Sequence, residues 1–292
     1  PALAWIVDVP ALEAQLQEAV RFQPQIELLD AAQSATLTVL CEGANGSSAQ
    51  QFGVEQDVIP YAQWAIAARI SCQLPHAQTA WQWFTSGEVL GFLPLDGDAG
   101  NLMAVVWSVD EGRKAELMAA NAEVFAQQLL QASESQLGPL HLVSERAAWP
   151  LQLSVAQRWC GVTEGASWVL AGDAAHTVHP LAGQGLNLGL ADVQELAARI
   201  HGRDYWRAVD DVKMLRGYER ARKADVALMG TLTDGLQQLF ARVGPQWQGV
   251  RSWGMNGFEH SGLLKRWVAR QAMGLRAGPF SIAAQTKGNE QR

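Results

Sequence analysis

The residues best suited to chemistry lie in one stretch, Gly-Asp-Ala-Ala-His-Thr-Val-His-Pro-Leu-Ala-Gly-Gln-Gly-Leu-Asn-Leu-Gly, which runs from Gly172 to Gly189. An ionised carboxylate such as that of Asp173 only accepts hydrogen bonds, so its natural partners are the hydroxyl groups of a sugar or polyol. The glycines at 183 and 185 allow positive φ and let a ligand reach the backbone without meeting a Cβ atom. These residues predict a binding site for a ligand with hydroxyl groups.

The elements that must position these residues are a strand before them and a helix at their end. The apolar run from Trp168 to Ala171 has the length of a strand and ends at the Gly-Asp turn. Apolar residues then recur at helical spacing, as the face Leu186, Leu190, Val193, Ala197 and Ile200. Unpaired N–H groups at the start of that helix favour an electron-rich or anionic group. The alternative is a tight connection between strand and helix that binds nothing.

Two histidines, His176 and His179, lie three residues apart in the same stretch. Such spacing suggests a metal site, but no cluster of Cys, Asp or Glu completes a ligand set. We therefore expect no metal, and we expect each histidine to hydrogen-bond the backbone.

The stretch from Gly172 to Gly189 resembles the second FAD-binding motif of the single-component flavoprotein aromatic hydroxylases, most closely the ubiquinone-biosynthesis hydroxylases. The resemblance implies that Asp173 binds the ribityl chain of FAD and that Pro180 shapes a loop on the substrate side. It also implies that the backbone lies against the pyrimidine edge of the flavin at Gly183, Gln184, Gly185, Leu186 and Asn187. A helix N-terminus there would stabilise the negative charge of a reduced flavin. No side chain need act as a nucleophile, because the cofactor performs the chemistry.

A second segment that could contact the cofactor follows residues 36–40. These residues alternate with β-branched side chains and predict a strand that ends at Cys41. The family has an Asp-Gly motif and a distal Arg that contact flavin and nicotinamide nucleotide. Here Glu42 and Gly43 occupy the place of that motif, and Ala49 stands where the Arg would fall. Two interpretations stay open: Glu42 and Gly43 contribute to the cofactor site, or they form a polar turn after a strand.

Composition excludes several other classes of protein. The chain of 292 residues is 48% apolar and 17% charged, and its net charge of −7 argues against a nucleic-acid partner. Three scattered cysteines predict a reducing compartment rather than a disulfide framework. No apolar run approaches the roughly 20 residues of a membrane span, and no signal peptide opens the sequence. We expect a cytoplasmic protein, with peripheral membrane contact as an option.

The middle of the chain predicts an antiparallel sheet, because strand-like runs at 61–74, 79–84, 89–95 and 102–109 are joined by short polar turns. These runs resemble the substrate-domain sheet of the ubiquinone-pathway hydroxylases. The aromatic residues that we expect to line an apolar substrate pocket are Trp81, Trp83, Phe84, Phe92 and Trp107. The alternative for each of them is packing in the core of the sheet.

The remaining segments are mostly helical in pattern. Helices are predicted from Pro10, over 111–133 as one long helix, and over 209–240, with a strand at 25–29 and extended structure at 140–143 and 149–153. In the helix over 209–240 the basic residues are expected to lie away from the buried face; they are Arg216, Arg220, Arg222 and Lys223. The basic, amphipathic segment 263–273 is expected to dock within the protein, with a partner or a membrane surface as alternatives.

The sequence as a whole predicts an α/β fold. We expect a partial FAD-binding, Rossmann-like domain at 1–55, a substrate domain with an antiparallel sheet at 56–154, a second FAD-binding segment at 155–203 and a helical segment at 204–292. The pyrophosphate-binding turn Gly-x-Gly-x-x-Gly is absent from the sequence. We therefore expect the chain to be a fragment of a longer protein.

The resemblance also implies a function. It indicates an FAD-dependent monooxygenase that uses NAD(P)H and O2 to hydroxylate an aromatic ring, with a polyprenyl phenol of ubiquinone biosynthesis as substrate and other proteins of that pathway as partners. One alternative is a noncatalytic scaffold subunit of the same fold. Another is a different flavin-dependent oxidoreductase, such as a reductase or a halogenase.

Overall fold

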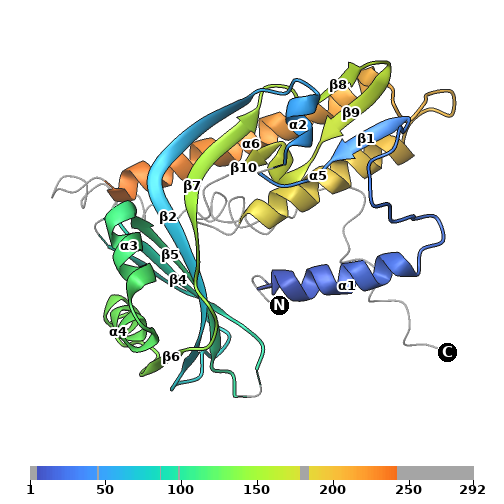
Figure 1. The fold of residues 1–292 in the computed structure, drawn as a ribbon. Coiled ribbons are helices and arrows are strands. Elements are labelled where there is room, and N and C mark those ends of the chain that lie inside the picture. The colour runs from blue at the N-terminus through green and yellow to red at the C-terminus, as the bar shows by residue number, and fades with distance from the viewer. Residues whose placement is uncertain (1–4, 45, 86, 98, 178–183, 242–292) are drawn as a thin grey trace, which may run out of the picture. The chain divides into compact units, whose positions relative to one another are not determined.

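The computed structural model describes residues 5–44, 46–85, 87–97, 99–177 and 184–241, and within it Ile6–Ala241 form one compact unit. The strands of the described residues form two sheets, one small and one large, together with helices from several parts of the chain (Figure 1). The predicted α/β class with an antiparallel sheet is confirmed.

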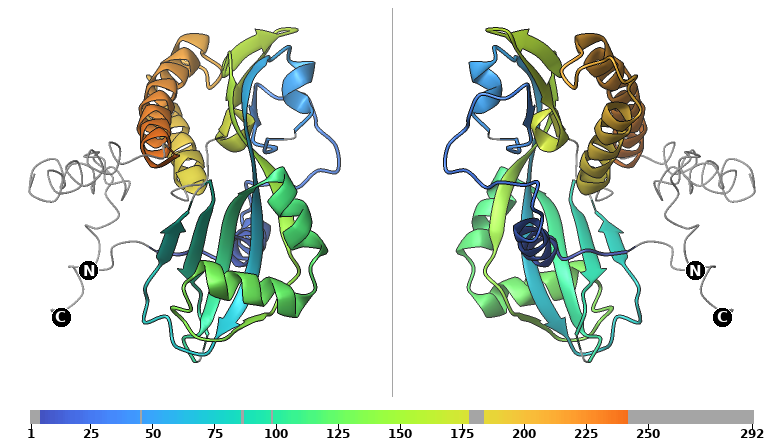
Figure 2. Two further views of the ribbon diagram at one scale, coloured as in Figure 1. Left: turned by 90° about the vertical axis from the view of Figure 1, so that its left-hand side faces the viewer. Right: turned by 90° about the vertical axis from the view of Figure 1, so that its right-hand side faces the viewer.

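The small sheet brings together strands from distant parts of the chain. Its order is β1 (Leu37–Leu40), β9 (Ala166–Leu170) and β8 (Cys160–Thr163), with β1 parallel and β8 antiparallel to β9. Two helices, α5 (Gln184–His201) and α6 (Val212–Ala241), share a hydrophobic core with this sheet, and Figure 2 shows them side by side. The short α2 (Ser48–Gln51) and the 3-10 turn η1 (Gly172–Ala174) follow β1 and β9.

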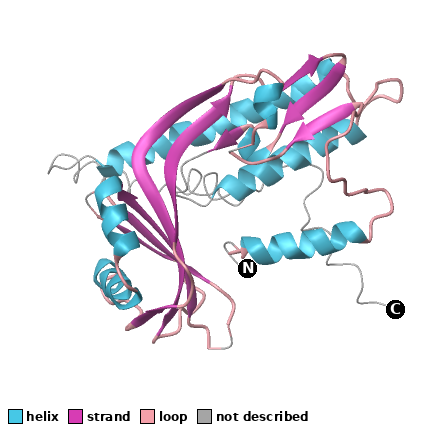
Figure 3. Cartoon of the chain, in the orientation of Figure 1, coloured by secondary structure: helices cyan, strands magenta, loops and turns pink. Residues whose placement is uncertain are grey.

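The large sheet is antiparallel throughout, and Figure 3 draws its strands in magenta. Its order is β10 (His176–Thr177), β7 (Ala147–Ala156), β2 (Gln56–Cys72), β5 (Leu102–Asp110), β4 (Val89–Pro94) and β3 (Trp81–Phe84), and β6 (Leu140–Leu142) also pairs with β2. The sheet agrees with the predicted pattern of strands, except that β2 begins before the predicted residue 61. Apolar side chains on one of its faces pack against α3 and α4.

The predicted single helix over 111–133 is wrong, because the structure has two helices, α3 (Glu111–Ala119) and α4 (Ala122–Ala132). Ala120 between them is extended, with ψ of 148°. The side chain of Asn121 accepts a hydrogen bond from the Val124 N–H and caps α4. The spacing of apolar residues does not reveal this break, because it takes no account of Asn121. Asn is nevertheless strongly favoured as an N-cap, where a new helix begins.

The predicted strand at 25–29 is also wrong. Residues 26–29 have no regular structure and are exposed, and they pair with no strand of the described chain. An apolar run becomes a strand only where a neighbour accepts its backbone hydrogen bonds, and this run has no such neighbour. The helix predicted from Pro10 is confirmed as α1 (Val9–Arg21).

None of the helices that the structure describes has both the length and the apolar content needed to cross a membrane. The predicted helix at 263–273 lies outside the described residues.

Candidate functional site

The two segments predicted to contact a cofactor leave the small sheet at the same edge. Leu40 and Leu170 are partners at the carboxyl ends of the parallel strands β1 and β9, and the Ala171 N–H donates to the Leu40 carbonyl at 3.0 Å. The turn at Cys41–Gly43 and the turn at Gly172 and Asp173 therefore start beside each other. Open α/β sheets bind ligands outside the carboxyl ends of their strands.

Both turns present open backbone to this edge. Gly172 has φ of +63° and Gly43 has φ of +81°, and a Cβ built on either residue would meet no other atom within 4 Å. Asp173 lies in η1 with an exposed side chain. An exposed carboxylate beside two unobstructed glycines fits a ligand that donates hydroxyl hydrogen bonds and must approach the backbone closely.

The side chain of Glu42 hydrogen-bonds within its own turn at this edge. Its carboxylate accepts hydrogen bonds from the Ser48 N–H, at 3.1 Å, and from the Ser48 hydroxyl, at the start of α2. These hydrogen bonds hold the pKa of Glu42 below its usual range. Ala49, at the place of the family's Arg, is buried. The geometry favours the polar-turn interpretation for the Glu42 side chain and leaves the backbone of Gly43 available.

The other predicted cofactor residues lie at the start of α5, which begins at Gln184. Gly185, Leu186 and Asn187 belong to its first turn, and a Cβ built on Gly185 would meet no atom within 4 Å. Pro180, Gly183 and His179 lie outside the described residues, as do Leu181 and Ala182 of the same loop.

The apolar face predicted for α5 is partly buried only towards its end, where Ile200 packs against the core of the small sheet. Leu190 and Val193 are 54% and 56% exposed, and Leu186 is 38% exposed. The residues that α5 buries most deeply are instead spaced four apart: Leu188, Asp192 and Leu196. The spacing of apolar residues does not identify the buried face of α5, because a carboxylate lies at the centre of that face.

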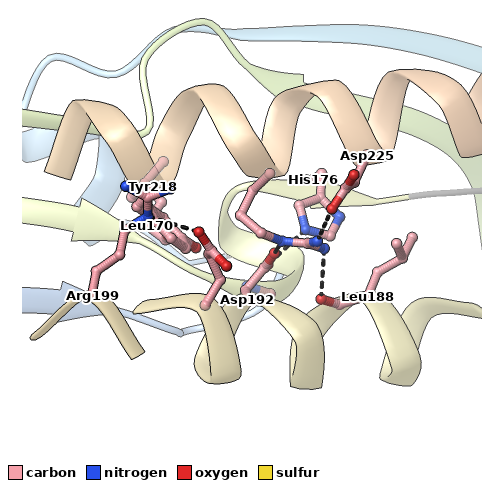
Figure 4. Close-up of polar contacts among 10 residues, drawn as sticks. Leu170, His176, Leu188, Asp192, Arg199, Tyr218 and Asp225 are labelled. Carbon is pink, nitrogen blue, oxygen red and sulfur yellow. Dashed lines mark hydrogen bonds and ion pairs between the residues drawn. The ribbon is translucent and has the colours of Figure 1, made fainter. Parts of the chain in front are cut away.

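That carboxylate, Asp192, is fully buried and joins several elements behind the Gly-Asp turn (Figure 4). It accepts hydrogen bonds from the Gly172 N–H at 2.8 Å, from His176 Nε2 at 2.7 Å and from Arg222 Nε at 2.6 Å. An ionised carboxylate only accepts, so Nε2 of His176 carries a proton. His176 also stacks on Trp159, with ring centroids 5.0 Å apart. The predicted backbone hydrogen bond of His176 is therefore replaced by a bond to a carboxylate.

The second charged member of this cluster is Arg222, which was predicted to lie away from the buried face of its helix and is in fact buried. Besides Asp192 it contacts Asp225, at 2.6 Å, and donates to the Leu188 carbonyl at 3.3 Å. Tyr218, one turn earlier in α6, donates its hydroxyl to the Leu170 carbonyl at 2.9 Å. Arg222 is tolerated in the core because each of its contacts is to an acceptor.

The electrostatics of the cluster favour an ionised Asp192. Burial raises the pKa of this carboxyl group. The hydrogen bond and charge of His176, with the hydrogen bonds from Arg222 and the Gly172 N–H, outweigh burial and leave the pKa below its ordinary value. Burial is the main cause that raises the pKa of Tyr218, so its hydroxyl stays protonated as a donor. The sequence signal that would have found Asp192 is its spacing of four residues from both Leu188 and Leu196.

The predicted pocket aromatics divide between the two faces of the large sheet. Trp81, Trp83, Phe92 and Trp107 share one face with side chains of α3 and α4, in one hydrophobic cluster. Trp107 also donates its indole N–H to Glu88 at 3.0 Å. This placement favours core packing for these four. Phe84 alternates to the opposite face and is 49% exposed.

The opposite face has a distinct composition. One cross-strand row links Phe84 to Val89, Val89 to Ser108, Ser108 to Ala65 and Ala65 to Trp149. Its ends are partly exposed aromatic side chains and its middle consists of small residues. Ser108 and Ala65 in the middle of the row are buried, so its exposed apolar surface lies at the two aromatic ends. Among the residues that the structure describes, no group of His, Cys, Asp and Glu side chains is arranged to hold a metal ion.

Comparisons with known proteins agree with this geometry. A family model described as "FAD binding domain" matches residues 14–227, which is more than half of the chain. The chain is 31% identical to 3-demethoxyubiquinol 3-hydroxylase of Escherichia coli, covering 82% of this chain and 60% of that protein. It is 32% identical to ubiquinone hydroxylase UbiL of Rhodospirillum rubrum, covering 84% of this chain and 56% of that protein.

Among solved structures, p-nitrophenol 4-monooxygenase of Pseudomonas putida matches with a TM-score of 0.60 at 19% identity, covering 82% of this chain and 59% of that one. At this identity the likeness shows the fold alone. The chain spans somewhat more than half the length of the curated relatives named above. With a family model that covers most of it, including both turns of the candidate site, the chain belongs to the FAD-binding domain family.

Proposed function

We propose that the protein is an FAD-dependent monooxygenase that hydroxylates an aromatic ring with NAD(P)H and O2, and that its substrate is a polyprenyl phenol of ubiquinone biosynthesis. The observation that supports this most directly is the convergence of the Cys41–Gly43 and Gly172–Asp173 turns at the carboxyl edge of β1 and β9. The two relatives, a 3-demethoxyubiquinol 3-hydroxylase and a ubiquinone hydroxylase, suggest the reaction and the pathway.

The residues of this chain would bind and orient the cofactor. Asp173 would accept hydrogen bonds from the ribityl hydroxyls, and the glycines at 43 and 172 would let the cofactor approach without steric conflict. The N–H groups in the first turn of α5 would stabilise negative charge at the pyrimidine edge. When bound, FAD supplies the redox chemistry between NAD(P)H and O2.

The substrate would lie on the face of the large sheet that bears Phe84 and Trp149. Between these two aromatic residues the row carries no aromatic or charged side chain, because it consists of Val89, Ser108 and Ala65. No Lys or Arg belongs to this row, so it offers no counter-ion for an acidic ring. This surface therefore favours a neutral, apolar phenol over a benzoate-type acid.

A direct test compares substrates in the holoenzyme. We expect NAD(P)H oxidation coupled to hydroxylated product with a prenylated phenol, and much weaker coupling with a benzoate-type acid. Preference for the acid would exclude the ubiquinone-pathway substrate and keep the monooxygenase class. Failure to retain FAD after reconstitution and gel filtration would favour the scaffold alternative, and halide incorporation in place of hydroxylation would favour the halogenase alternative.

The location of the protein follows from the proposed substrate. A polyprenyl phenol resides in membranes, so we expect a cytoplasmic protein in peripheral contact with a membrane and with other enzymes of the pathway. Cell fractionation tests this, because a peripheral protein leaves the membrane fraction in high salt. Recovery entirely in the soluble fraction at low salt would argue against membrane contact.

A further inference from the structure

The Gly-Asp turn depends on a buried side chain that lies outside the motif. Gly172 adopts the left-handed conformation, with φ of +63°, and its N–H donates to Asp192 of α5 at 2.8 Å. Asp192 and Asp173 are too far apart in the sequence for a pattern of neighbouring residues to link them. The contact nevertheless fixes the orientation of the Ala171–Gly172 peptide, one residue before Asp173.

Asp192 is itself held from two other directions. His176 Nε2 contacts Oδ2, the same oxygen that accepts the Gly172 N–H, and Arg222 Nε contacts Oδ1. Both supporting side chains are at least 96% buried, so water does not compete for these hydrogen bonds. Arg222 is anchored in turn by Asp225 and the Leu188 carbonyl.

The α5 backbone also approaches the turn closely. A Cβ built on Gly189 would lie 3.5 Å from the Cα atom of Gly172, so a methyl group at Gly189 would already be in van der Waals contact with the turn. Asp192 lies less than one helical turn further along α5. The start of α5 and the Gly-Asp turn carry most of the predicted cofactor contacts. The hydrogen bond from Gly172 to Asp192 links the two where their backbones approach each other.

We propose that Asp192 is a positioning residue, held by His176 and Arg222, which keeps the Gly172–Asp173 turn and the start of α5 in the arrangement that binds the cofactor. Its effect on FAD rests on the proposed function, whereas its effect on the turn does not. Asp192 itself, being buried behind the turn, has no direct contact with a ligand at the exposed side chain of Asp173.

The test uses two readouts on Asp192→Asn. Asparagine keeps the shape but presents an amide NH2 to a site that is lined by donors, so at least one of the three hydrogen bonds is lost. In the flavin-free protein, we expect amide exchange across residues 166–177 to speed up by about tenfold or more. In the same variant, the Kd for FAD measured by flavin fluorescence should rise by about tenfold.

A matched control is Glu219→Gln. Glu219 is a part-buried carboxylate on α6, with contacts to the Trp159 N–H, the Cys160 thiol and Lys223, and it does not touch the Gly172 turn. We expect this variant to lower the melting temperature without changing exchange across 166–177 or FAD affinity. Equal effects of both variants on exchange and affinity would overturn the positioning role, because they would reflect general destabilisation.

A second pair of variants decides the question if Asp192→Asn fails to fold. His176→Gln places an amide donor near the position of Nε2, whereas His176→Leu keeps the bulk and removes the donor. We expect the Gln variant to retain slow exchange and FAD affinity and the Leu variant to lose both. Indistinguishable variants would overturn the proposal. Wild-type protein that binds no FAD would contradict the proposed function, and the exchange measurement would still test the role of Asp192.

Discussion

Replacing Gly172 by alanine separates backbone strain from loss of ligand space. Gly172 has φ of +63°, where a residue with a Cβ atom costs about 1–2 kcal/mol. No atom within 4 Å would clash with the new methyl group, so the free energy of unfolding should fall by no more than this strain. For a chain of this size the melting temperature should drop by about 2–8 °C.

The same methyl group would project into the space that we assign to the cofactor. We therefore expect Gly172→Ala to weaken FAD binding by about tenfold or more, equivalent to ~1.4 kcal/mol, beyond its effect on stability. Thermal unfolding of the flavin-free protein and a flavin fluorescence titration measure the two effects separately.

The turn between β8 and β9 supplies a matched control. Gly165 has φ of +82°, and a Cβ built on it would also meet no atom within 4 Å. It lies at the opposite end of β9 from the candidate site. Gly165→Ala should lower the melting temperature as much as Gly172→Ala and leave FAD affinity unchanged. If both variants bind FAD equally well, the open space at Gly172 is not part of the cofactor site.

Three further outcomes follow from the structure. Asp173→Ala should raise the Kd for FAD about ten- to a hundredfold, because a charge-assisted hydrogen bond is lost, and an unchanged Kd in the titration would leave Asp173 as a turn residue only. Gly161→Ala should destabilise by about 1–3 kcal/mol in chemical denaturation, because its Cβ would lie 2.7 Å from Cζ2 of the buried Trp168, and a neutral effect would contradict this packing. Asp192 stabilises the fold at pH values above its ordinary pKa of 3.8, and this contribution is lost as the pH falls through its lower folded pKa. In Asp192→Asn the free energy of unfolding should therefore fall less steeply with decreasing pH, and an unchanged pH dependence would contradict an ionised Asp192.

The motif and the alternation of polar and apolar residues sufficed to predict much of this fold. Four antiparallel strands in the middle of the chain were predicted, because each is a continuous run bounded by polar turns. The turn at Gly172 was predicted from its glycine and aspartate, whose backbone and hydrogen-bonding properties are local.

Features that depend on pairing across the chain were not predicted. The face of α5 that is buried could not be identified from apolar residues, because Asp192 lies at its centre and is stabilised by Arg222, 30 residues further along the chain. Trp107 and Phe84 look alike in sequence, and only the register of β5, β4 and β3 places them on opposite faces. The strand predicted at 25–29 is wrong for the same reason, since no strand within the described part of the chain pairs with it.

The pairing of β1 with β9 has a consequence for the order in which the protein folds. Leu37 pairs with Ser167, so closing this contact in an unfolded chain spans on the order of 130 residues. The large sheet shortens that path, because Gln56 pairs with Ala156 and brings the two ends of the intervening segment together. Once it has formed, the remaining segments between Leu37 and Ser167 total about 30 residues, which lowers the closure cost by about 1.3 kcal/mol.

The large sheet should therefore form before the edge at which the two turns meet. Contacts between residues far apart in sequence form slowly unless earlier structure has brought them close. A chain that has folded only its large sheet would be compact and protected there, yet unable to bind at the edge of β1 and β9. Binding competence in this protein would then be the last property to appear during folding and the first to disappear during unfolding.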